Sequence, residues 1–254
     1  MTVLFISGID TDIGKTIATG QLAKALYQKE HKIITQKLVQ TGCCDIAEDL
    51  ITHRNMMGIP LQGGDKDGTT CPYVFSKPAS PHLSSALEQT AIEPDLITAA
   101  TDKLLKDYDI VLLEGAGGLM VPITHSLLTL DYIAEQGYPI VLVTSGRLGS
   151  INHTLLSIEA IESRSLKLHA LIYNQWQPNN DDSTYKKDDE IVDSTRQYLY
   201  AYLQAKHPQT YWVDLPVESA EQRIQALDTG KPIDNPADNF FSLANYADVL
   251  GQIH

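Results

Sequence analysis

The chain has 254 residues, of which 43% are hydrophobic and 20% charged, and it contains no repeat or low-complexity tract. This length and composition are typical of a globular protein with a sizeable core, and they exclude a chain that is disordered throughout. The formal net charge of -13 disfavours nucleic acid and anionic membranes as partners, because both would be repelled by an acidic surface. We therefore expect no nucleic-acid partner and no membrane partner.

The three cysteines, Cys43, Cys44 and Cys71, have neither the spacing of a zinc site nor the density of a secreted disulfide scaffold. We expect them to be free thiols. The start of the chain lacks the basic and apolar regions of a secretion signal, and no apolar run approaches the roughly 20 residues of a membrane span. These features predict a cytoplasmic protein.

The first predicted element is an apolar strand that starts at Val3 and breaks at Gly8 into a glycine-flanked loop, followed by a helical pattern. This order directs backbone N–H groups and the positive end of a helix toward one point, an arrangement that binds phosphate. Five residues separate Gly8 from Gly14, whereas the usual phosphate loop has four. Lys15 is placed to bind the outer phosphates of a nucleotide, and the Thr16 hydroxyl is placed to bind magnesium.

A second predicted strand, Lys32 to Lys37, follows the first helix and completes one βαβ unit. In an open parallel sheet the carboxyl ends of neighbouring strands face one crevice. Lys37 could therefore approach the phosphates that Lys15 binds. The alternative is an exposed lysine at the end of a strand.

Residues 43–90 have a less regular pattern. A helix is expected from Ala47 to Met57, and a polar, glycine-rich loop over residues 62–70. Long irregular segments in compact domains are usually functional or mobile. Asp49 is the acid of most interest in this segment, although an aspartate on the surface of a helix is the ordinary interpretation.

The second strong signal is a continuous apolar strand that starts at Asp109 and ends in Glu114 and a glycine turn. Such a strand is typical of a sheet covered on both faces. An acid at the tip of a strand beside a phosphate loop is where a magnesium-binding carboxylate is expected. The glycines of the turn allow the backbone to approach a ligand closely; they are Gly115, Gly117 and Gly118.

The remaining elements continue the alternation of helices and strands. We expect helices over residues 92–108, 129–136, 151–164, 188–206 and 240–250, and strands over residues 139–144, 168–173 and 211–215. No linker-like stretch interrupts this order. The sequence predicts one domain, residues 1–254, with an α/β fold of the P-loop NTPase type: a doubly wound, mostly parallel sheet of about seven strands with helices on both faces.

Six blocks occur in order along the chain: Gly8–Thr16, Lys37–Gly42, Pro78–His82, Glu114–Gly118, Gly149–His153 and Asn174. Together they resemble the dethiobiotin synthetase family over nearly the whole chain, most weakly at residues 42–73 and beyond residue 176. The resemblance implies a ligase that uses ATP and carbon dioxide to close a ureido ring on 7,8-diaminononanoate, a step of biotin synthesis. It further implies a carbamate and a carbamic–phosphoric anhydride as intermediates.

The resemblance also implies roles for single residues. Lys15 and Lys37 would be catalytic, and Mg²⁺, the implied cofactor, would be held by Thr16, Asp49 and Glu114. The residues implied to bind ATP are Asp12, Ile13, Gly14, Lys15, Thr16, Ile17, Asp49, Glu114, Gly115, Ala116, Gly117, Asn174, Gln175, Pro216 and Val217. The residues implied to bind the diamine substrate are Thr11, Thr41, Gly117, Gly118, Gly149, Ser150, Ile151 and Asn152. Residues 149–152 resemble a segment through which a neighbouring subunit binds the carboxylate tail of the substrate, which implies a homodimer with the active site at its interface.

The chain departs from the family pattern in places. Leu38 stands where a proline is common, and Asp49 lies closer to the block before it than is usual. Two alternatives stay open. One is a dimeric P-loop ATPase switch, a class that usually has an extra lysine at the start of the phosphate loop, where this chain has Ile9 and Asp10. The other is a related P-loop amidase or ligase.

Overall fold

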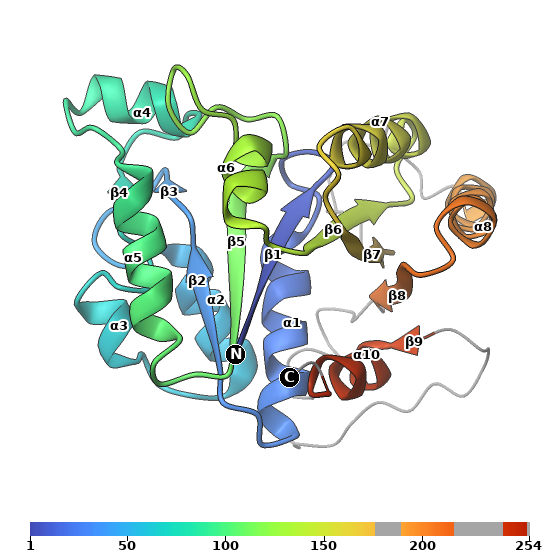
Figure 1. Cartoon of the computed structure of the whole chain (residues 1–254), viewed down its shortest axis with the longest axis horizontal. Helices are drawn as coiled ribbons and strands as arrows, with labels where there is room; N and C mark the ends of the chain where they lie inside the picture. The colour runs from blue at the N-terminus through green and yellow to red at the C-terminus, as the bar shows by residue number, and fades with distance from the viewer. Residues whose placement is uncertain (176–188, 216–240, 253–254) are drawn as a thin grey trace.

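A parallel sheet with the strand order β2-β5-β1-β6-β7-β8-β9 forms the centre of the molecule (Figure 1). The computed structural model describes residues 1–175, 189–215 and 241–252. The strands are β1 (Thr2–Gly8), β2 (Ile33–Lys37), β5 (Ile110–Gly118), β6 (Ile140–Ser145), β7 (Leu168–Asn174), β8 (Tyr211–Leu215) and β9 (Phe241–Ser242). Six of them have five residues or more, and β9 at the edge has two. The predicted doubly wound parallel sheet is confirmed.

Helices cover both faces of this sheet. One face packs against α1 (Lys15–Gln28), α2 (Glu48–Met57) and α10 (Leu243–Leu250). The other packs against α5 (Pro94–Leu104), α6 (Thr129–Gln136), α7 (Ser150–Glu162) and α8 (Asp189–Lys206). Alternate residues of a strand join opposite cores: Leu4 and Ile6 join the first, and Phe5 joins the second. Because both faces are buried, the strands read as continuous apolar runs rather than alternating ones.

The segment over residues 43–90 is more regular than the sequence predicts. It contains α3 (Gly63–Lys66), α4 (Pro81–Leu87) and β4 (Val74–Phe75), which pairs in parallel with β3 (Gln40–Thr41) in a second, two-stranded sheet. The expected loop over residues 62–70 thus contains a short helix. Its first turn is closed by a capping box between Gln62 and Asp65, which satisfies backbone N–H groups that would otherwise lack partners.

The predicted C-terminal helix over residues 240–250 starts too early. Phe241 and Ser242 form β9, which pairs with β8, and α10 begins at Leu243. A short apolar run at this point of the sequence is compatible with either an amphipathic helix or a short edge strand, so periodicity alone does not distinguish the two. Within the described ranges, no helix has the length and apolar composition that a bilayer span requires.

The register of the sheet places Lys37 and Glu114 on neighbouring strands. Lys37 pairs with Glu114 across β2 and β5, and Ile6 of β1 flanks Glu114 on the other side. Glu114 lies inside β5 and not at its tip, because β5 continues to Gly118 after a register shift relative to β1. This corrects the predicted position of the acid, and it explains why a lysine distant in sequence lies beside it.

Candidate functional site

The loop between β1 and α1 has the backbone geometry of an anion-binding site. Asp12 and Gly14 both adopt left-handed conformations, with φ of 54° and 90°. Backbone N–H groups that follow such residues converge on one side of a loop and bind anions. Gly14 is the N-cap of α1, so the positive end of this 14-residue helix faces the same place. The geometry supports the predicted phosphate loop.

Lys15 is buried against this loop, with 7% of its surface exposed. Its ammonium group donates a hydrogen bond to the backbone oxygen of Asp10, at 2.9 Å. Burial lowers the pKa of Lys15, and the positive charge of Lys37 acts in the same direction, whereas Glu114 and Asp49 oppose the change. The side chain is therefore held at the rim of the loop, next to a second cation.

Lys37 is the centre of a buried charge cluster. Its ammonium group donates to Glu114 Oε1 at 2.8 Å and to the backbone oxygen of Gly115 at 3.1 Å, and it forms an ion pair with Asp49. Thr16 donates from its hydroxyl to the same Glu114 Oε1, at 3.1 Å. Four side chains from β2, β5, α1 and α2 thus meet at the carboxyl edge of the sheet.

The electrostatics of this cluster keep both of its central groups charged. Burial alone would lower the pKa of Lys37, but the carboxylates of Glu114 and Asp49 raise it above its usual range. Burial alone would raise the pKa of Glu114, but the charge of Lys37 and the neighbouring His53 side chain lower it below its usual range. The two residues form a tightly coupled ion pair in which each stabilises the charge of the other.

The residues predicted to hold Mg²⁺ are brought together. Thr16 and Glu114 are hydrogen-bonded to each other, and Asp49 and Glu114 share the ammonium group of Lys37. Mg²⁺ prefers oxygen ligands and commonly takes one or two carboxylates together with nucleotide phosphates and water. Among the described residues, no group of three or more histidine, cysteine or acidic side chains forms a metal site. Two carboxylates and a hydroxyl fit a cation that arrives with a nucleotide.

His53 is a member of the cluster that the sequence analysis missed. It is fully buried, and its Nε2 lies 3.1 Å from Glu114 Oε2. One signal was present in the sequence: His53 follows Asp49 by four residues, so both lie on the same face of α2. A helix that directs Asp49 toward the site also directs His53 toward it.

The predicted substrate residues near the end of β5 lie against the phosphate loop. A Cβ added to Gly117 would lie 3.7 Å from the hydroxyl of Thr11, and one added to Gly118 would lie 3.3 Å from the backbone oxygen of Gly8. Thr11 is exposed, and Thr41, at the end of β3, is half-buried. The backbone at the end of β5 is therefore within reach of any ligand bound in the phosphate loop.

The segment over residues 149–152 forms the start of α7. Gly149, at φ 94°, is the N-cap, and Asn152 is exposed. The hydroxyl of Ser150 is buried and faces Ser145 at 3.2 Å, so this side chain does not point outward. The loop before α7 is tied to the phosphate loop by an ion pair of 2.6 Å between Arg147 and Asp10.

Asn174, predicted to bind ATP, packs onto the phosphate loop. Its Nδ2 donates to the backbone oxygen of Ile13 at 2.9 Å. Gln175 follows at the end of β7, where its backbone N–H donates to Leu215 at 3.5 Å. Pro216 and Val217 lie outside the described residues. Contact of these four residues with ATP stays a prediction.

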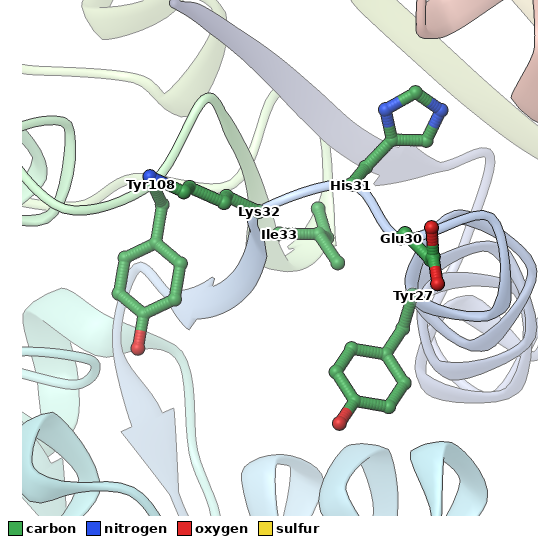
Figure 2. Close-up of a pocket in the computed structure, with 6 residues that line it drawn as sticks. All are labelled: Tyr27, Glu30, His31, Lys32, Ile33 and Tyr108. Carbon is green, nitrogen blue, oxygen red and sulfur yellow. The ribbon is translucent and has the colours of Figure 1, made fainter.

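A pocket of about 530 Å³ lies at the opposite end of α1 (Figure 2). It is lined by Tyr27, Glu30, His31, Lys32, Ile33 and Tyr108. None of the predicted site residues line it. Because α1 runs for 14 residues from the phosphate loop to this pocket, roughly 20 Å separate the two places. This pocket is not the candidate active site.

Comparison with known proteins gives a family model and several relatives for this chain. The family described as "AAA domain" matches residues 2–212. An ATP-dependent dethiobiotin synthetase of Pasteurella multocida (strain Pm70) is 52% identical over 209 residues, which cover 82% of this chain and 94% of that protein. This chain belongs to the dethiobiotin synthetase family. A second family member, from Chlorobaculum tepidum, is 49% identical over 201 residues, covering 79% of this chain and 81% of that protein.

Membership of the dethiobiotin synthetase family confirms the resemblance drawn from the six sequence blocks. A solved structure of lower sequence identity has a similar fold. A plasmid partition protein from Borrelia burgdorferi B31, bound to AMPPNP, has a TM-score of 0.50 and 12% identity over 98% of this chain and 97% of its own. At this identity the likeness concerns the fold alone.

Proposed function

We propose that this protein is a ligase that forms dethiobiotin from 7,8-diaminononanoate, carbon dioxide and ATP in biotin synthesis, as the names of its relatives indicate. The observation that carries the proposal is the convergence of Lys15, Lys37, Glu114 and Thr16 beside the phosphate loop. These are the groups that a reaction between a triphosphate and a second anion requires.

The reaction has three steps. One substrate amine adds to carbon dioxide and loses a proton to give a carbamate. A carbamate oxygen then attacks the γ-phosphorus of ATP, so that ADP leaves and a carbamic–phosphoric anhydride forms. The second amine attacks the carbonyl carbon and loses a proton, phosphate leaves, and the ureido ring closes. In such a sequence the protein contributes chiefly by positioning the reactants and stabilising charge.

In this mechanism Lys37 and Lys15 bind the anions that react. Lys37 lies on the β2–β5 side of the site and stabilises charge on the carbamate and the transferring phosphoryl group. Lys15, at the rim of the phosphate loop, binds the outer phosphates. Mg²⁺, held by Thr16, Asp49 and Glu114, would neutralise phosphate oxygens.

The diamine would lie along the end of β5, between Thr11 and Thr41, where half-buried backbone meets the phosphate loop. A homodimer is supported by large apolar side chains next to the predicted substrate residues. Leu148, directly before Gly149, is 78% exposed, and Met120, two residues after the end of β5, is 52% exposed. Burial of such side chains favours association between subunits.

The test is an assay of the purified protein with ATP, Mg²⁺, bicarbonate and 7,8-diaminononanoate. We expect dethiobiotin by mass spectrometry, and phosphate release that needs both the diamine and carbon dioxide. Equal ATP hydrolysis in their absence, together with no cyclic urea in their presence, would refute the proposal. A nucleotide-driven change in assembly without any cyclic urea would instead favour the ATPase switch.

A further inference from the structure

His53 lies between Glu114 and Thr35 in the interior of the protein. Its Nε2 is 3.1 Å from Glu114 Oε2, and its Nδ1 is 3.1 Å from the hydroxyl oxygen of Thr35. All three side chains are fully buried. Glu114 thus has one oxygen facing Thr16 and Lys37 and the other facing His53.

Thr35 is in turn fixed by a buried ion pair. Arg54, one residue after His53 on α2, donates from Nη1 to the Thr35 hydroxyl at 2.7 Å and from Nη2 to the Thr35 backbone oxygen at 3.2 Å. The same guanidinium forms two hydrogen bonds to Asp65, at 2.8 and 2.9 Å. The carboxylate of Asp65 also accepts a hydrogen bond from the Thr70 hydroxyl, at 2.7 Å. Arg54 therefore has a single orientation, and so does the hydroxyl it contacts.

The positions of the protons follow from these partners. An arginine side chain can only donate, so the Thr35 oxygen accepts from Arg54 and has its own proton left to give. Among the hydrogen bonds of the described residues, the other partner of this hydroxyl is Nδ1 of His53. Nδ1 is then the acceptor, and Nε2, which lies 3.1 Å from Glu114 Oε2, carries the ring proton. The carboxylate, which accepts, requires the same arrangement.

We propose that His53 is a positioning residue that orients the carboxylate of Glu114 through an Nε2–H donor, and that Thr35 and the Arg54–Asp65 pair fix its tautomer. The inference rests on the proposed function in so far as Glu114 binds Mg²⁺ with the nucleotide. A carboxylate held at Oε2 presents Oε1 to Thr16 and Lys37 in one orientation. Hydrogen-bonding partners of this kind behind a metal ligand commonly contribute 10–100-fold to metal affinity or activity, which sets the scale of the effect expected here.

The tautomer is tested without any substrate. Two-bond ¹H–¹⁵N correlation spectra of the histidine rings, with His53 assigned by its loss in His53→Gln, should show a protonated Nε2 and an unprotonated Nδ1. Thr35→Val removes the hydroxyl at nearly constant volume and should change this pattern, whereas Thr35→Ser should preserve it. A proton on Nδ1 in the wild-type protein would overturn the proposal.

The effect on the site is tested by the binding of AMPPNP, measured by calorimetry at a series of Mg²⁺ concentrations. In His53→Leu we expect the Mg²⁺ concentration for half-maximal binding to rise by about 10–100-fold. His53→Gln places an amide donor near the Nε2 position and should restore most of the binding. His53→Asn places its amide near Nδ1 and should not.

The matched control is His169→Leu, which removes a histidine that is 3% exposed on β7 and packs against Tyr211 and Tyr246. It should leave the Mg²⁺ dependence unchanged. An equal change in His169→Leu and His53→Leu would show a general effect of losing a buried ring and would overturn the positioning role. Absence of dethiobiotin formation by the wild-type protein would overturn the proposed function, and the NMR spectra and the AMPPNP-binding measurements would still decide the role of His53.

Discussion

The charge cluster around Lys37 predicts a large effect of Lys37→Met on stability, besides the loss of turnover. The side chain of Lys37 is 6% exposed; the substitution keeps most of its aliphatic volume and removes the ammonium group, which contacts both Glu114 and Asp49. Removal of one partner from a buried ion pair leaves an uncompensated charge and typically costs about 3–5 kcal/mol. We expect a loss of this size in the free energy of unfolding at pH 7.

The destabilisation by Lys37→Met should depend on pH, in a direction that follows from the pKa of Glu114. In the wild type the pKa of Glu114 is lowered, so its contribution to stability is present above the unfolded pKa near 4.5 and is lost as the pH falls through the folded pKa. Without Lys37, burial favours the protonated form of Glu114. The destabilisation by Lys37→Met should therefore be largest near neutral pH and should shrink as the pH falls toward 4.5.

The assay is urea unfolding followed by circular dichroism at pH 7 and pH 5. Lys103→Met is the matched control, because the Lys103–Asp67 pair is 61% and 53% exposed and such pairs contribute little. Addition of Glu114→Gln to Lys37→Met should restore part of the lost stability. A loss below about 1 kcal/mol at pH 7, or no recovery in the double variant, would refute the argument from buried charge.

Two further predictions concern the phosphate loop and the interior. Gly14→Ala should abolish nucleotide binding measured by calorimetry, because Gly14 has a φ of 90° and the added Cβ would lie 2.2 Å from Asn174 Nδ2. The control is Gly137→Ala, where φ is 67° and no atom lies within 4 Å of the added Cβ. It should only lower the free energy of unfolding, by about 1 kcal/mol. Burial, aided by Lys167, lowers the pKa of His169 to about 4, so its contribution to stability should be present above pH 6.5 and lost as the pH falls to 4. In His169→Phe the free energy of unfolding, measured by urea titration at a series of pH values, should vary less between pH 6.5 and pH 4 than in the wild type. An unchanged pH dependence would contradict this.

The fold was predictable from the sequence because the sheet is buried on both faces. Strands such as β5 and β6 are continuous apolar runs, and the helices between them have apolar stripes, so element type and order are readable. The four-residue α3 and the seven-residue α4 were missed because each is too short to show a period. They begin among glycines and prolines, which also mark loops.

The placement of the candidate site residues was predictable where a residue type at a given position has one plausible chemistry. Lys15, Thr16 and Glu114 stand at recognisable positions relative to a strand and a glycine loop. The partners of His53 were not predictable, because Thr35 and Glu114 become its neighbours only through the register of the sheet and the packing of α2. The contribution of such residues depends on spatial neighbours that a linear pattern does not contain.

The charge balance of the cluster has a consequence for how ligands bind. Lys15 and Lys37 carry two positive charges, and Asp49 and Glu114 carry two negative ones, so the four groups sum to zero. An anion alone would draw the lysines but face the carboxylates, and a cation alone would do the reverse. In a metal–nucleotide complex, the phosphates can pair with the two lysines while the metal ion pairs with the two carboxylates. By linkage, the metal ion and the nucleotide each strengthen the binding of the other.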